Sequence, residues 1–293
     1  MEKLEHYKSE LKKLGADDAT CEEVLEYCEN KFNVKDYTPG EIEDEPFVGA
    51  WRNIISEIHD GNINEVINER IPHGAEEVKL RSPQSVSMEI YNSIAGNIPV
   101  IYAKDEEDFY EIVKKLIYKG MPAPNIEKTG ASFAYGKNNK FIILSNKPYS
   151  NIPAEKLGLE DKQWREYSVI IRREHECTHY FTKRFLGSSQ NNLHDELIAD
   201  FTGIMCAAGE FKAKWFLAGM GLDMYPEKQE IGRFPVYTAK LSDKAAEIMK
   251  KVIIKVANNV EEWSKQESVK KMTRNERVLF LCSNSLLDLY NLY

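Results

Sequence analysis

The sequence predicts an α+β fold, in which a mixed lobe with a small sheet and an edge hairpin is followed by a mainly helical lobe. Two β-rich stretches, 98–102 and 131–145, lie in the first half of the chain. After residue 160, apolar residues recur at helical spacing. A chain of 293 residues with 42% hydrophobic residues is large enough for two lobes around a cleft.

The region 1–125 is expected to be mixed but mostly helical. Gly15 separates the first two helices, and Thr20 and Glu23 have the spacing of a capping box. Residues 60–97 show no clear pattern, and Met121-Pro122-Ala123-Pro124 is the best candidate for a break between subdomains. The expected elements are helices over 2–14, 18–31 and 46–59, a strand over 98–102, and a helix over Asp105–Tyr118.

The region 126–190 is expected to hold the edge hairpin and one long helix. The hairpin comprises residues 131–145 around Gly136-Lys137-Asn138-Asn139. The helix runs from Asp161 to Leu186, because apolar or aromatic residues recur three, four or seven positions apart. Gly187 then stands where a helix C′ residue is expected.

The region 191–293 is expected to be helical. Asn192 is the expected N-cap of its first helix, with Asp195 at N3. A long helix is expected near 243–266, and a last helix is expected to start at Thr273, with Glu276 at N3.

The composition argues against several classes of protein. The formal net charge is −8 and no basic block compensates it, which argues against nucleic acid as a partner. No stretch approaches a membrane span, and the N-terminus has no hydrophobic signal-peptide segment. Five cysteines without a framework indicate reduced thiols and a cytoplasmic protein. The oligomeric state stays open.

The most specific pattern is His175-Glu176-Cys177-Thr178-His179, an HExxH sequence within the expected helix. Residues i and i+4 of a helix lie on one face, so both histidines can direct a ring nitrogen at one metal ion. Glu176 lies about 100° further round, where it can reach a water molecule without acting as a ligand. Cys177 lies on another face and is expected to pack in the core.

The next helix presents Glu196 and Asp200, again at positions i and i+4. With the two histidines they make a three-ligand zinc site plus a spare carboxylate. We expect His175, His179 and Glu196 to bind Zn²⁺, and Asp200 to accept the far ring N–H of a ligand histidine. His194 stays open as an alternative third ligand, although it points to a different side of the helix.

HECTH followed by Glu196 and Asp200 as ExxxD resembles the gluzincin metallopeptidases of the thermolysin type, over residues 131–205. The resemblance implies a zincin-like fold with the active-site helix between the two lobes, in a bacterial-type member of that family. It implies the three zinc ligands named above, Glu176 as the base and Asp200 beside a ligand histidine. It also implies that the edge hairpin pairs with an extended peptide or protein substrate.

The sequence departs from that family in one respect. No histidine follows His194, so the downstream histidine that helps to hold the tetrahedral intermediate in the family has no counterpart. Tyr225, Arg233 and Tyr237 are the available donors in the following segment. We select Tyr237 as a catalytic residue, because phenols commonly fill this role in related enzymes.

Three functions are compatible with these residues. The leading one is a zinc metallopeptidase that hydrolyses peptide bonds through a zinc-bound water activated by Glu176. The alternative is a catalytically weak zincin-fold binding or regulatory protein, which the missing histidine favours. A zinc hydrolase acting on a non-peptide amide is the third. The intact Glu176 favours an enzyme, since structural zinc usually has four closed protein ligands and needs no base.

Two further features are expected to have no chemical role. Arg172 and Arg173 are expected on a solvated helix face, where either can pair with Glu174. Cys21 and Cys28, seven residues apart, are expected on the apolar face of a helix rather than as a metal-binding pair.

Overall fold

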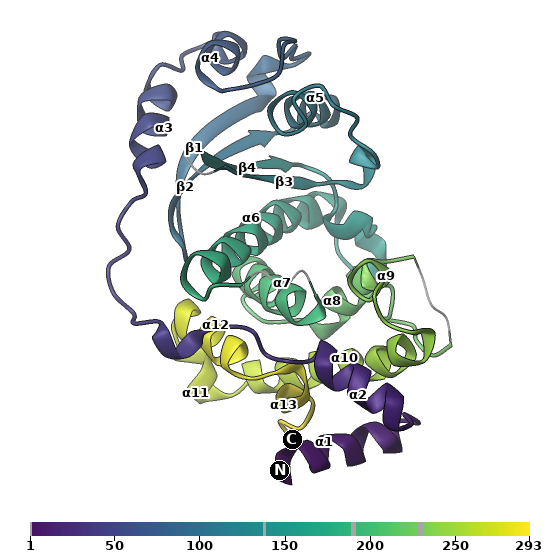
Figure 1. Ribbon diagram of the computed structural model, residues 1–293. Coiled ribbons are helices and arrows are strands. Elements are labelled where there is room, and N and C mark those ends of the chain that lie inside the picture. The colour runs from purple at the N-terminus through teal and green to yellow at the C-terminus, as the bar shows by residue number, and fades with distance from the viewer. Residues whose placement is uncertain (1, 137–138, 189–191, 228–230) are drawn as a thin grey trace. The chain divides into compact units, whose positions relative to one another are not determined.

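The computed structural model describes residues 2–136, 139–188, 192–227 and 231–293. Within these ranges it contains 13 α-helices and one four-stranded sheet, which confirms the expected α+β class (Figure 1). The chain divides into a sheet unit, Pro39–Thr178, and a helical unit, Met1–Thr38 with His179–Tyr293. The boundary falls inside helix α6 (Asp161–Phe185), which runs unbroken through both units.

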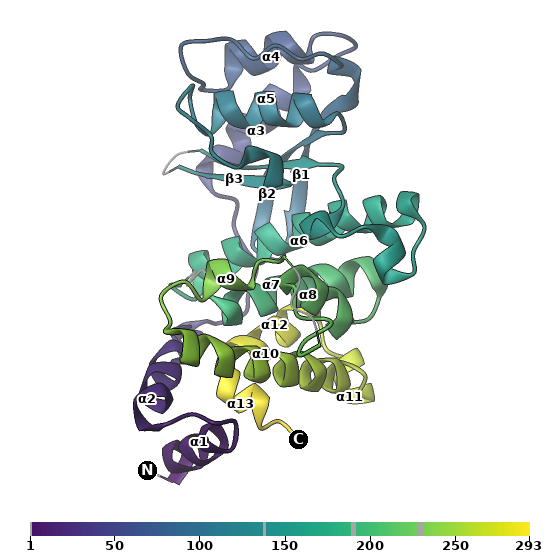
Figure 2. The same ribbon diagram turned by 90° about the vertical axis from the view of Figure 1, so that its right-hand side faces the viewer.

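The sheet unit is built on a mixed sheet with the strand order β1-β2-β4-β3. Strands β2 and β4 pair in parallel, and the other two pairs are antiparallel. Figures 1 and 2 show α5 on one face of this sheet and the first part of α6 on the other. The elements are α3 (Pro46–Ser56), α4 (Ile63–Arg70), β1 (Val86–Ser93), β2 (Gly96–Ala103), α5 (Glu106–Leu116), β3 (Ala131–Tyr135) and β4 (Lys140–Ser145).

The expected hairpin over 131–145 is confirmed as the pair β3–β4, with β3 at the edge of the sheet. Residues 137–138 of its turn lie outside the described residues. Strand β1 was not predicted, because it lies within 60–97. Its side chains alternate only partly between buried and exposed, so the period of two that marks a strand is weak there.

The helical unit is organised around α10 (Asp243–Ser264), which contacts α2, α8 and α13. The α2 side of this packing is apolar: Cys21 and Cys28 are buried, as expected, and Cys28 Sγ lies 3.7 Å from Met249 Sδ. The remaining helices are α1 (Glu2–Lys13), α2 (Asp18–Tyr27), α7 (Leu193–Ala208), α8 (Ala213–Met220), α9 (Phe234–Tyr237), α11 (Glu267–Lys270), α12 (Arg274–Ser283) and α13 (Leu286–Tyr290).

The two units of the structure have different boundaries from the three regions expected from the sequence, which were 1–125, 126–190 and 191–293. Helices α1 and α2 belong to the helical unit, together with His179–Tyr293 (Figure 2). Helix periodicity shows that α2 has an apolar face, but not which distant helix covers that face. No helix in the described ranges is both long enough and apolar enough to cross a membrane.

Local helix-end residues were predicted with mixed success. The Asn192 side chain caps α7 by accepting from two backbone N–H groups, and Gly187 has φ +70°, as a C′ glycine requires. The capping box of Thr273 and Glu276 is present at α12. The capping box expected at Thr20 and Glu23 is wrong: Asp17, three residues before Thr20, caps α2 at 2.8 Å.

Candidate metal centre

Helix α6 presents His175 and His179 one turn apart, as the i and i+4 spacing requires. The side chain of His175 is buried and that of His179 is 18% exposed. Glu196, in the first turn of α7, is 3% exposed. Each of the three residues offers a ligand atom within 4.8 Å of the other two. The structure therefore brings together the three residues that the sequence predicted as ligands.

The spacing of these atoms is compatible with zinc. Two ligands at about 2.0–2.1 Å from a tetrahedral zinc ion lie about 3.4 Å apart. His179 Nε2 lies 3.4 Å from Glu196 Oε1. The ligand atoms of the three residues lie at most 4.8 Å apart, and two atoms at that distance would have to move about 1.4 Å closer to match this geometry. Two imidazoles and one carboxylate are also the donor set of many catalytic zinc sites.

The second ring nitrogen of His179 faces a carboxylate that was not predicted as its partner, that of Asp195. His179 Nδ1 lies 3.4 Å from Oδ2 of Asp195, whose side chain is buried. Burial lowers the pKa of His179, but the hydrogen bonds to Asp195 and Glu196 outweigh this and raise its pKa well above the usual value. At His179, Asp195 thus fills the role that was predicted for Asp200. Its position next to Glu196 was the available clue.

His175 has a different partner. The hydroxyl of the buried Tyr149 lies 3.1 Å from His175 Nδ1, and the two rings meet edge to face. Since Nδ1 contacts the phenol, Nε2 is the nitrogen that a metal ion would take. Tyr149 lies 26 residues before His175 in an irregular segment, and nothing in the sequence marked it.

Side chains on one face of α6 hold the segment that contains Tyr149 in place. Trp164 Nε1 donates to the carbonyl of Ile152 at 2.8 Å, and Ser168 Oγ accepts from Tyr149 N at 2.8 Å. Arg172 donates to the carbonyls of Lys147 and Pro148. These three helix residues are four apart, so they form one stripe that fixes residues 147–152.

The solvated face expected for the two arginines is therefore wrong for Arg172. Its side chain is 5% exposed, because its guanidinium satisfies buried backbone carbonyls. Arg173 contacts Glu174 at 3.7 Å, one of the pairings left open by the sequence, and stacks on the ring of Tyr91.

Arg233 joins the two carboxylates of α7. Its guanidinium lies 2.8 Å from Glu196 Oε2 and also pairs with Asp200, and both carboxylates are buried. Gly232 makes this placement possible: a Cβ there would lie 2.2 Å from the backbone nitrogen of Gly221. In the sequence, Arg233 stands out only as one of three possible donors.

Of the three expected donors, Tyr237 and Arg233 lie beside Glu196. Burial raises the pKa of the Tyr237 phenol, Arg233 opposes this, and a hydrogen bond to Glu196 raises it further. Tyr237 therefore stays protonated near neutral pH. Tyr225 contacts Glu247 instead, and this hydrogen bond together with burial raises its pKa to about 12.

Glu176 is half-buried on α6, and its side chain makes no hydrogen bond or ion pair with any residue that the structure describes. Its carboxylate is thus not committed to a structural contact. The alternative ligand His194 is wrong: it is buried, and its Nε2 lies 3.0 Å from the carbonyl oxygen of Leu281. Cys177 is fully buried, as expected for a core residue, and burial raises the pKa of its thiol.

Comparison with protein-family models assigns the chain to a family. Residues 67–140 and 138–292 match a family of unknown function (DUF7005), and the chain belongs to that family. Neither a curated protein nor a solved structure matches the chain.

Proposed function

We propose that this protein is a zinc-dependent hydrolase of the gluzincin type that cleaves peptide bonds. The observation that carries the proposal is the convergence of His175, His179 and Glu196, from two helices, with an uncommitted Glu176 beside them. Three protein ligands with a base at hand are characteristic of catalytic rather than structural zinc sites.

Each residue then has a definite task. His175 and His179 would hold the metal through Nε2, with Glu196 as the third ligand, while Tyr149 and Asp195 fix the orientation of the two rings. When bound, zinc supplies a Lewis acid that polarises the substrate carbonyl and lowers the pKa of a water molecule. Glu176 takes the proton of the attacking water and returns it to the leaving amine nitrogen. Tyr237 donates a hydrogen bond to the oxyanion of the substrate.

The peptide class of the substrate is supported by the sheet. Strand β3 lies at its edge and pairs with another strand on one side only, so its other side offers backbone hydrogen bonds to an extended chain. An extended peptide is the ligand that matches such an edge. A zincin-like architecture and a cytoplasmic location remain part of this proposal.

One observation favours a second candidate, a zincin-fold binding or regulatory protein with little turnover. Arg233 pairs with Glu196 at 2.8 Å, so part of the negative charge of the third ligand is already neutralised without a metal ion. A carboxylate shared in this way donates less charge to zinc. Turnover measurements separate the two candidates.

The test is the Glu176→Gln substitution, which keeps the size of the side chain and removes the base. We expect unchanged zinc content and a loss of peptide hydrolysis of at least about 10²-fold. The matched control is Glu166→Gln, an exposed glutamate on the same helix, which should leave turnover unchanged. A fully active Glu176→Gln protein would rule out the proposed mechanism. A wild-type protein that binds zinc but hydrolyses no peptide would favour the binding-protein candidate.

A further inference from the structure

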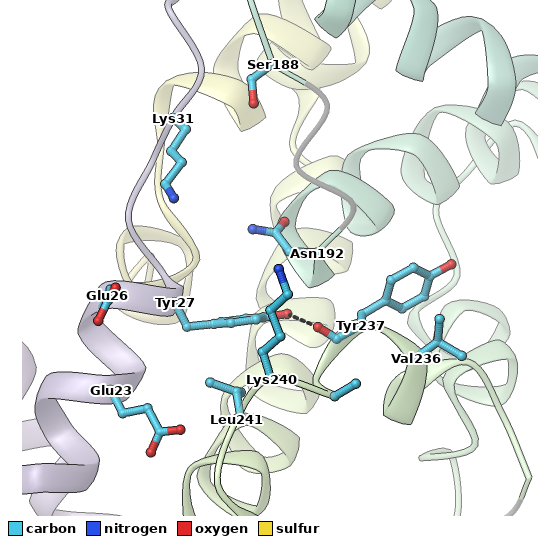
Figure 3. A pocket seen from close by; sticks show the side chains of 11 residues that line it. Glu23, Glu26, Tyr27, Lys31, Ser188, Asn192, Val236, Tyr237, Lys240 and Leu241 are labelled. Atoms are coloured by element: carbon cyan, nitrogen blue, oxygen red, sulfur yellow. Dashed lines mark hydrogen bonds between the residues drawn. The ribbon is translucent and has the colours of Figure 1, made fainter. Parts of the chain in front are cut away.

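The helical unit contains a cavity of about 820 Å³, large enough for a small ligand or for several residues of a peptide (Figure 3). It lies among the end of α2, the start of α7, and α9 with the segment that follows it. Its lining residues are polar and apolar in similar measure: Glu23, Glu26, Tyr27, Lys31, Ser188, Asn192, Val236, Tyr237, Ala239, Lys240 and Leu241.

Three of the lining residues connect this cavity to the third zinc ligand. Tyr237 lines the cavity, and its phenol lies near enough to Glu196 for the carboxylate to raise the pKa of the phenol. The carbonyl of Asn192 accepts from the backbone N–H of Glu196 at 3.1 Å. Tyr27 Oη accepts from Leu193 N at 3.0 Å and donates to the carbonyl of Tyr237 at 3.2 Å. The cavity therefore begins within one helical turn of the ligand Glu196.

The cavity holds two lysines that are not engaged elsewhere. Lys31 and Lys240 are exposed, and neither forms an ion pair within the ranges that the structure describes. Figure 3 shows their ammonium groups, with the side-chain amide of Asn192, directed into the same space.

The two glutamates of the lining lie on the α2 side of the cavity (Figure 3). Both carboxylate oxygens of Glu23 accept from Ser242, at 2.6 Å each. Glu23 is thus held at the start of α10 and keeps its charge, so the lining carries two positive and two negative groups. Figure 3 shows the lysine ammonium groups and the Asn192 amide apart from the two glutamate carboxylates, so these donors are grouped together near Asn192.

We propose that this cavity binds a carboxylate of the substrate, on one side of the bond that is cleaved. The inference rests on the proposed function, because it takes the metal centre as the place of cleavage. Two ammonium groups and an amide N–H group are donors that a carboxylate accepts from. The carboxylate comes from the C-terminus of a short peptide or from an aspartate or glutamate side chain, and the experiment distinguishes these two sources.

The experiment measures peptide binding by calorimetry to the zinc-loaded Glu176→Gln protein, so that no peptide is consumed. The probes are Ala-Ala-Ala with a free C-terminus, the same peptide as its amide, and Ala-Glu-Ala amide. We expect at least one of the two carboxylate peptides to bind at least about fivefold more tightly than the neutral amide, the range of an exposed ion pair. The stronger of the two identifies the source of the carboxylate.

The double substitution Lys31→Gln and Lys240→Gln should abolish this preference and leave binding of the neutral amide unchanged. Lys271→Gln, at an exposed lysine outside the cavity, is the matched control and should keep the preference. Equal binding of all three peptides by the parent protein would overturn the inference, and so would a preference that survives the double substitution. If the wild type hydrolyses no peptide but the lysines still govern carboxylate binding, the proposed function fails and the carboxylate site stands.

Discussion

The two histidines of the candidate metal centre lie one turn apart on α6, yet their surroundings differ. His179 has Asp195 at one ring nitrogen and Glu196 at the other, and Arg233 and Asp200 extend this ionised cluster. His175 has the phenol of Tyr149 at Nδ1. A carboxylate that accepts an imidazole N–H raises the basicity of the ring more than a neutral phenol does.

From this difference we expect the two histidines to donate unequally to a bound metal ion. With a metal ion bound, we expect His179 to be the stronger electron donor, because its ring faces a carboxylate. We expect His175 to be the weaker donor, because its ring is held by a neutral hydrogen bond. Asp195 thus supplies the charge beside His179, while Tyr149 sets the orientation of the His175 ring.

The largest effect is expected from removing Arg233, which compensates two buried carboxylates. Arg233→Gln should lower the free energy of unfolding of the metal-free protein by about 3 kcal/mol, the cost of a broken buried ion pair. With zinc bound, the loss should be smaller, because the metal ion compensates the charge of Glu196. Denaturant unfolding with chelator and with zinc measures both values.

The control for this comparison is Lys270→Gln, which removes an exposed helix-surface pair with Glu267. It should change the free energy of unfolding by less than about 1 kcal/mol in both conditions. An Arg233→Gln protein that loses the same stability with and without zinc would show that Arg233 does not share Glu196 with the metal.

The second-largest effect, a loss of zinc affinity, is expected from Asp195→Asn. This substitution gives His179 a neutral partner like that of His175. The amide oxygen can still accept the N–H of the ring, so orientation is kept and only charge is lost. Zinc affinity, measured by competition with a chromogenic chelator, should fall about 30-fold. Unchanged affinity would mean that the carboxylate does not act on the metal through His179.

The smallest effect is expected from Tyr149→Phe, which removes the hydroxyl beside His175 and keeps the ring. Zinc affinity should fall about tenfold, less than for Asp195→Asn. Tyr225→Phe is the matched control, because it removes a phenol that contacts Glu247 and should leave zinc affinity unchanged. A larger loss for Tyr149→Phe than for Asp195→Asn would reverse the comparison between the two histidines.

The sequence predicted those parts of the site that depend on local spacing. The HExxH pair, the end of α6 at Gly187 and the cap at Asn192 all follow from helix geometry over a few residues. The position of Glu196 follows from the same rule, once α7 is known to pack beside α6.

The residues that surround the ligands could not be predicted in the same way. Tyr149 reaches His175 because a stripe of α6 residues binds an irregular segment, and Arg233 reaches Glu196 because Gly232 allows a close backbone approach. Both placements depend on tertiary packing, which leaves no periodic pattern in the sequence. At His179 the assignment to Asp200 instead of Asp195 failed for a related reason: helix spacing places Asp200 on the face of Glu196, but it does not show which carboxylate the ring of His179 meets.

The central claim is a zinc site with three protein ligands, and elemental analysis of the purified protein tests it most directly. We expect one zinc ion per chain in the wild type, and zinc that is lost or greatly weakened in Glu196→Ala. His194→Gln, which changes the buried histidine two residues earlier, should keep the metal. A folded wild-type protein that holds no zinc after reconstitution with excess metal would contradict the account.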